Sequence, residues 1–121
     1  MRPKTGGGFI EKIAILTCIK SNSVCTGASC LKAMNERTRS FAPYKGEPLQ
    51  LMAFLHCNGC ACDYDTDPGF LEKLERLEQI GVEIVHAGIC TRKHDGSECS
   101  QITKILSKME EKGMKVVRGT H

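Results

Sequence analysis

The sequence lacks tryptophan, has only two tyrosines, and scatters its basic residues along the chain instead of gathering them in one stripe. Nucleic-acid surfaces usually combine clustered Lys and Arg with aromatic side chains, so nucleic acid is not an expected partner. No apolar run approaches the roughly 20 residues that cross a bilayer. The charged start MRPKTGGGF is not followed by the apolar core of a secretory signal. We therefore expect a cytoplasmic protein that does not contact membranes.

Glycine-rich phosphate motifs of the Rossmann and P-loop kinds are also missing, and no thioredoxin-like strand pattern is present. What remains is an ordinary globular composition: 40% of the 121 residues are hydrophobic and 26% are charged. This length suits one domain that buries a core without disulfide staples. We predict a flexible tail over residues 1–8 and a single domain over residues 9–121.

Four short apolar runs, at residues 12–17, 49–55, 82–87 and 114–119, have the character of strands. The first three are almost continuously apolar and β-branched, which is typical of parallel strands that are covered on both faces. The fourth run is short and fits an edge of the sheet.

Helical periodicity appears between the strands. Apolar residues recur on one face over residues 70–80, after Asp67 as the predicted N-cap and before Gly81 as the C-terminal glycine. A second such stripe covers residues 97–113, with Ser97 as the predicted cap. These signals predict two amphipathic helices that pack against the sheet.

The first helix is less sharply marked and is predicted over residues 27–39, followed by a loop over residues 40–48 because of its prolines and glycine. The alternation of strands and helices indicates an α/β fold. With right-handed crossovers it becomes a single three-layer domain: a four-stranded parallel sheet of order 2-1-3-4, a truncated flavodoxin-like arrangement with helices on both faces.

Eight cysteines fall at equivalent places in this predicted topology. Single cysteines follow the first and third strands, three lie soon after the second strand, and three more precede or begin helices; His121 follows the fourth strand. Because the carboxyl ends of parallel strands meet at one edge, all these residues are expected to gather there, where open α/β sheets bind ligands. The candidate metal ligands are Cys18, Cys25, Cys30, Cys57, Cys60, Cys90, Cys99 and His121.

These candidates differ in the strength of their signal. Cys57 and Cys60 form a CxxC motif at a strand end, the most specific pattern in the chain. Cys30 and Cys99 lie in predicted first turns of helices, where the helix dipole favours thiolate. Cys62 has no such placement. Of the histidines inside strands, His86 is expected to be a hydrogen-bonded core residue, and His56 to pack near the site without binding metal.

Two functions remain open on these residues. In a reducing cytosol, clustered cysteines indicate metal binding or catalysis instead of disulfides. Zinc is favoured as the metal, since four Cys or three Cys plus His suit its tetrahedral geometry, with iron or an iron–sulfur cluster as the alternative. The second function is a thiol–disulfide or metal-ion reductase in which Cys57 attacks and Cys60 resolves. The number of thiols favours metal binding.

The pattern of cysteines resembles the CGGC-domain family. The resemblance rests on Cys18, the stretch CTGASCLKA (25–33), CNGC (57–60), Cys90 after VHAGI, Cys99 and the ending GTH. It implies a small metal-binding α/β protein. Asn58 stands where the family motif has its first glycine, and because Asn tolerates left-handed backbone geometry, the turn is expected to survive.

Overall fold

The computed structural model describes residues 10–20, 24–91 and 96–119. Its strands are β1 (Glu11–Thr17), β2 (Leu49–His56), β3 (Ile84–Ala87) and β4 (Lys115–Arg118). All of them pair in parallel, and their order across the sheet is β2-β1-β3-β4. The predicted α/β class and strand order are both confirmed.

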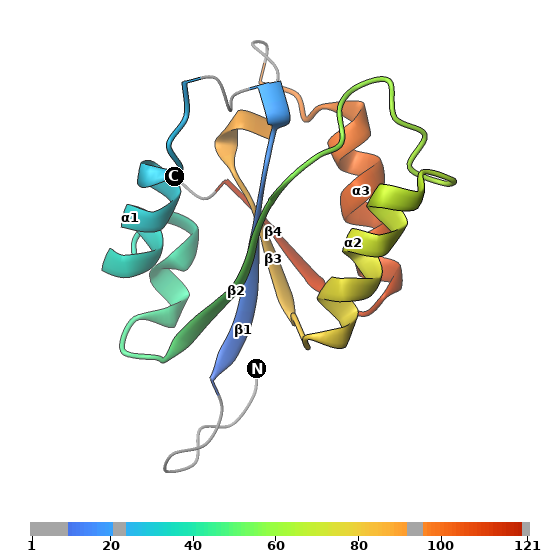
Figure 1. Ribbon diagram of the computed structural model, residues 1–121. Helices are drawn as coiled ribbons and strands as arrows, with labels where there is room; N and C mark the ends of the chain where they lie inside the picture. The colour runs from blue at the N-terminus through green and yellow to red at the C-terminus, as the bar shows by residue number, and fades with distance from the viewer. Residues whose placement is uncertain (1–9, 21–23, 92–95, 120–121) are drawn as a thin grey trace.

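Helices cover both faces of this sheet (Figure 1). One face is covered by α1 (Ala28–Glu36) and the 3-10 helix η2 (Arg39–Tyr44), the other by α2 (Pro68–Gln79) and α3 (Ser100–Glu111). A short 3-10 turn, η3 (Ile89–Thr91), follows β3. All strands point toward the upper edge in Figure 1, which we call the carboxyl edge.

β1 lies inside the sheet and contributes to both cores. Ile13 and Ile15 pack on the side of α1 and η2, whereas Ala14 and Leu16 pack on the side of α2 and α3. Side chains alternate between faces along a strand, and both faces are covered here, which explains the continuous apolar sequence. The buried strand fixes the position of the residues that follow it at the carboxyl edge.

The predicted limits of α2 are confirmed. The side chain of Asp67 accepts a hydrogen bond from the backbone N–H of Phe70 at 2.8 Å, which satisfies one donor of the first helical turn. At the other end Gly81 has φ +81°, the left-handed geometry that closes a helix at little cost for glycine.

Three expectations about helix limits were wrong. α3 is capped by Cys99 and not by Ser97, because the carbonyl of Cys99 accepts the first helical hydrogen bond. α1 is shorter than residues 27–39, because Arg37 turns left-handed at φ 57° and ends the helix. Residues 40–48, predicted as a loop, include most of η2.

His86 on β3 anchors η2 and is the hydrogen-bonded core histidine that the sequence predicts. It is fully buried; Ser40 Oγ lies 3.2 Å from its Nδ1, and the Tyr44 hydroxyl lies 3.0 Å from its Nε2. The ring of Phe41 stacks on it with centroids 4.1 Å apart. Burial lowers the pKa of His86 to about 4, and the charge of Lys115 acts in the same direction.

Among the described residues, no helix is long and apolar enough to cross a membrane. The tail predicted over residues 1–8 and the candidate ligand His121 lie outside the described residues.

Candidate thiolate site at the carboxyl edge

Three cysteines meet where β1, β2 and β3 end. The backbone N–H of Cys18 donates to the Sγ of Cys90 at 3.4 Å, and the N–H of Ile19 donates to the Sγ of Cys57, also at 3.4 Å. Two neighbouring amides after β1 therefore hold sulfurs that come from the two flanking strands. We call Cys18, Cys57 and Cys90 the thiol centre.

Cys30 joins this centre from α1. Its side chain is only 1% exposed. A methyl group placed on Gly88 would lie 3.4 Å from the Sγ of Cys90 and 3.6 Å from the Sγ of Cys30. The two sulfurs therefore border the same space, which stays open because residue 88 has no side chain.

The turn after Cys57 is held by a buried tyrosine. The Tyr64 hydroxyl accepts a hydrogen bond from the N–H of Asn58 at 2.9 Å and donates to the carbonyl of Gly59 at 2.8 Å. Burial raises the pKa of Tyr64, so this hydroxyl keeps its proton and remains a donor. Cys57 itself is only 6% exposed. Sequence reasoning missed Tyr64, whose one signal was its place soon after the CxxC motif.

Asn58 supports this turn in a way that the sequence did not indicate. Gly59 has the left-handed backbone, at φ +99°, whereas Asn58 is not among the described residues with positive φ. The turn is therefore formed, as expected, but without left-handed geometry at Asn58. Its side chain instead donates to Asp67 Oδ2 at 3.0 Å and accepts from Lys73 Nζ at 2.5 Å. Asn58 thus ties the turn to the start of α2.

Cys60 lies at the surface beside a cation. A hydrogen bond to Cys60 raises the pKa of the Lys20 ammonium, and the charges of Cys60, Cys18 and Cys99 act in the same direction. The side chain of Gln101, in the first turn of α3, donates to the carbonyl of Cys60 at 3.1 Å. Sequence reasoning missed Lys20, although its position two residues after Cys18 placed it at this edge.

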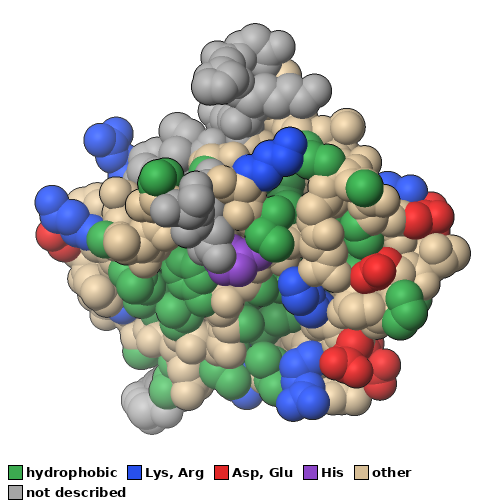
Figure 2. Space-filling view, turned by 45° about the horizontal axis from the view of Figure 1, so that its top comes forward, with side chains coloured by type: hydrophobic (Ala, Val, Ile, Leu, Met, Phe, Trp, Pro, Cys, Tyr) green, Lys and Arg blue, Asp and Glu red, His purple; other side chains and the backbone are tan. Residues whose placement is uncertain are grey.

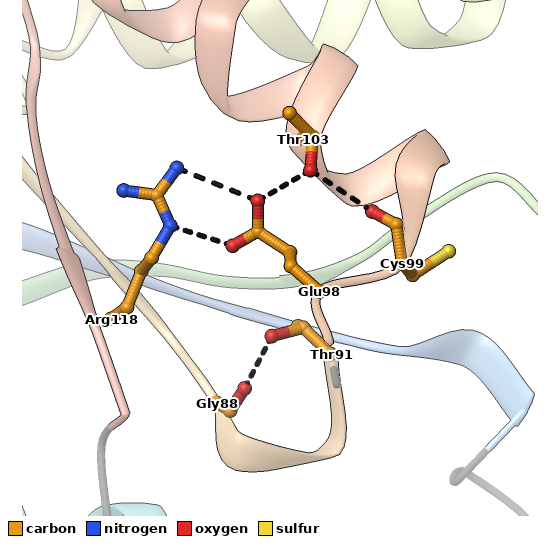
Figure 3. Close-up of polar contacts among 6 residues, drawn as sticks. All are labelled: Gly88, Thr91, Glu98, Cys99, Thr103 and Arg118. Atoms are coloured by element: carbon orange, nitrogen blue, oxygen red, sulfur yellow. Dashed lines mark hydrogen bonds and ion pairs between the residues drawn. The ribbon is translucent and has the colours of Figure 1, made fainter. Parts of the chain in front are cut away.

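Cys99 is set at the start of α3 by a polar network (Figure 3). The carboxylate of Glu98 accepts from Arg118 Nε at 2.6 Å and from Thr103 Oγ1 at 2.5 Å. Figure 3 shows the Cys99 sulfur pointing away from Glu98 and Arg118. The network therefore fixes the backbone of Cys99 and leaves its thiol available to the carboxyl edge.

Cys25 and Cys62 are not part of the thiol centre. Cys25 is exposed in the loop before α1, where its Sγ accepts the N–H of Gly27 at 3.3 Å. Cys62 is partly exposed; desolvation raises the pKa of its thiol, and the charge of Asp67 adds to the shift. All eight cysteines lie within the described residues, and none is in a disulfide. The structure thus gathers most, but not all, of the predicted ligands.

The gathered side chains do not form a closed ligand group. In the described ranges, no three Cys, His, Asp or Glu side chains lie close enough together to hold a metal ion. The convergence at the carboxyl edge follows the predicted topology, whereas the ligand assignment of each cysteine stays a prediction.

These features define a small α/β protein with a cysteine-rich carboxyl edge. The model of the CGGC domain family matches residues 12–121. An uncharacterized protein of Methanocaldococcus jannaschii is 34% identical over 119 residues, which cover 91% of this chain and 86% of that protein. No solved structure gives a significant match. The chain belongs to the CGGC domain family.

Proposed function

We propose that this protein binds a transition-metal ion through cysteine thiolates at its carboxyl edge. The observation that supports this most strongly is the pair of N–H···S hydrogen bonds from Cys18 and Ile19 to Cys90 and Cys57. They bring the sulfurs at the ends of β2 and β3 to two neighbouring backbone amides after β1. Backbone donors to a ligating sulfur are a common second layer of metal–thiolate sites.

The donor chemistry fits zinc or iron. Cys57, Cys60, Cys90 and Cys18 are the four ligands we propose, with Cys30 beside them. Four thiolates suit tetrahedral zinc, and the same set suits iron or an iron–sulfur cluster. A divalent ion with four thiolates carries a net charge of about −2, which the Lys20 ammonium would partly offset.

Metal binding requires the thiols to move closer together, since the described residues hold no preformed group of three ligands. The sulfurs of Cys57 and Cys90 already accept hydrogen bonds from the two amides after β1. We therefore expect the exposed Cys60 to move most when the metal binds. Each thiol releases its proton to solvent as it binds. We therefore expect metal uptake to be coupled to ordering of the Cys57–Cys60 turn.

Cobalt titration of reduced, metal-free protein tests this proposal. Thiolate–cobalt absorption should rise to a sharp end point in the wild type. Cys57→Ser should weaken binding by about tenfold or more, because it removes a buried ligand. Cys62→Ser is the matched control, since Cys62 lies outside the thiol centre, and it should titrate like the wild type. An absorption that never develops in the wild type would disprove the proposal.

A second candidate is a thiol–disulfide reductase, in which the burial of the two thiols favours exchanged roles within the motif. Cys57 is buried, whereas Cys60 is exposed and hydrogen-bonded to Lys20. An attack by Cys57 on an external disulfide would be sterically blocked. In this candidate the Cys60 thiolate attacks, one substrate sulfur leaves as a thiolate, and Cys57 then displaces the second sulfur. Cys57→Ser should therefore trap a mixed disulfide on Cys60; its absence favours metal binding.

A further inference from the structure

A cavity of about 230 Å³ lies beside the thiol centre, between the ends of β1 and β2 and the loop before α1. Its wall contains the side chains of Cys18, Cys25 and His56 together with those of Thr17, Thr26 and Phe54. Figure 2, which brings the carboxyl edge forward, shows a histidine side chain at the surface among hydrophobic ones. The cavity thus combines two thiols and an imidazole in one space open to solvent.

The imidazole in this wall is held in place. Thr17 Oγ1 lies 2.7 Å from His56 Nδ1, and Thr17 is itself only 3% exposed. The ring of Phe54 meets the imidazole edge-on, with centroids 6.4 Å apart. Because Nδ1 is hydrogen-bonded to Thr17, Nε2 is the ring nitrogen of His56 that can bind a ligand.

The other wall is fixed by a close backbone approach. Gly27, at φ +78°, lies so near the Phe54 ring that a methyl group there would come within 2.8 Å of Cζ. The same Gly27 donates its N–H to the Sγ of Cys25. Cys25 and Phe54 are therefore held on adjoining sides of the cavity.

The sulfurs differ in their access to solvent. Cys25 is exposed and Cys18 half-buried, whereas Cys57 and Cys30 are 6% and 1% exposed. An ion from water therefore meets the exposed sulfurs, Cys25 in this cavity and Cys60 in the CxxC turn, before it meets the buried ones. Cys18 is part of both the cavity wall and the thiol centre, because its side chain lines the cavity while its N–H donates to the Sγ of Cys90.

We propose that this cavity is the entrance for the metal ion, which Cys25 and His56 bind first and pass to Cys18. The inference rests on the proposed metal-binding function. Two protein donors leave an ion with open coordination positions, so it is held weakly and exchanges readily. Cys25 loses its proton to solvent when it binds the ion. In the transfer, the Cys18 thiol loses a proton as it binds, His56 is released, and the Cys25 sulfur is released and takes up a proton; the charge of the ion does not change.

Stopped-flow uptake of zinc by reduced, metal-free protein tests the entrance role. Cys25→Ser and His56→Asn should each slow uptake by about tenfold, equal to about 1.4 kcal/mol on the barrier, while the final stoichiometry stays that of the wild type. Cys62→Ser, which removes a thiol outside the cavity, should leave the rate unchanged. Circular dichroism would verify that each variant is folded.

The outcomes separate the two proposals. If the wild type takes up zinc and the rates in Cys25→Ser and His56→Asn are unchanged, the entrance role is wrong. The proposed metal binding would not be affected by that result. A lower final stoichiometry in Cys25→Ser would also overturn the entrance role, since Cys25 would then be a permanent ligand. A wild type that takes up no zinc would refute the proposed function itself.

Discussion

The backbone N–H of Cys18 lies 3.4 Å from the sulfur of Cys90, although 72 positions separate these residues in the sequence. Their strands, β1 and β3, are neighbours in the order β2-β1-β3-β4, and the direction of the chain connections reverses between them. Open α/β sheets bind ligands at such a reversal. The contact therefore places Cys18 and Cys90 at the strand-order reversal, where open α/β sheets usually bind their ligands.

Alanine at Gly27 should destabilise the fold more than alanine at Gly46. Both glycines have φ +78°, but only Gly27 has Phe54 in the way of a methyl group; Gly46 has no atom within 4 Å. Both variants bear a left-handed backbone cost of about 1–2 kcal/mol. Gly27→Ala should lose about 1 kcal/mol more, because Phe54 must move. Denaturant titration of both variants measures this difference, and equal losses would contradict the packing described for the cavity wall.

Stability should fall as the pH is lowered from 6.5 to 4 because of His86. The folded protein holds this pKa near 4, whereas an unfolded histidine titrates near the ordinary value of 6.5. Between these values the unfolded chain binds the extra proton, so acid favours unfolding, by up to about 3 kcal/mol. Denaturation of metal-free protein at several pH values measures the slope. His86→Gln removes the titrating group and should flatten it; an unchanged slope would exclude His86 as the cause.

Alkylation should distinguish the two cysteines of the CxxC motif. In metal-free protein Cys60 should react first because it is exposed, and Cys57 should lag because it is buried under the turn. Zinc should slow both, since coordination shields the sulfurs. Mass spectrometry of timed samples locates each adduct. The ligand assignment fails if both cysteines react at the same rate with and without zinc.

Loss of the Asn58 amide should loosen the turn. Asn58→Ala removes hydrogen bonds to Asp67 and Lys73 and should lower the free energy of unfolding by about 1–2 kcal/mol. Gln79→Ala, which removes an exposed hydrogen bond to Glu75, is the control and should cost little. A loss in Asn58→Ala no larger than in Gln79→Ala would show that the side chain of Asn58 does not hold the turn.

The sequence predicted the sheet well because its signals are local and strong. Continuous apolar runs marked the strands, and Asp67 and Gly81 marked the ends of α2. Right-handed connections then left few strand orders to consider. The convergence of strand ends follows from that topology alone, so the sequence predicts that Cys18, Cys57 and Cys90 lie at one edge of the sheet.

Details that depend on side-chain contacts were not predictable from local pattern. The role of Asn58 depends on Lys73 and Asp67, which reach it only after α2 packs. Lys20 lies beside the thiol of Cys60 only because the end of β1 packs next to the turn that contains Cys60. The 3-10 helix η2 forms over a proline-containing stretch because Phe41 and Tyr44 pack on the buried His86. Tertiary packing decided each of these features.

Elemental analysis of protein purified without oxygen, combined with zinc titration of the metal-free form, tests the central claim most directly. The proposal predicts zinc or iron in stoichiometric amount in the purified protein, and zinc uptake that a chelator reverses while the chain stays folded. Protein with every thiol reduced, no bound metal and no uptake on titration would contradict it.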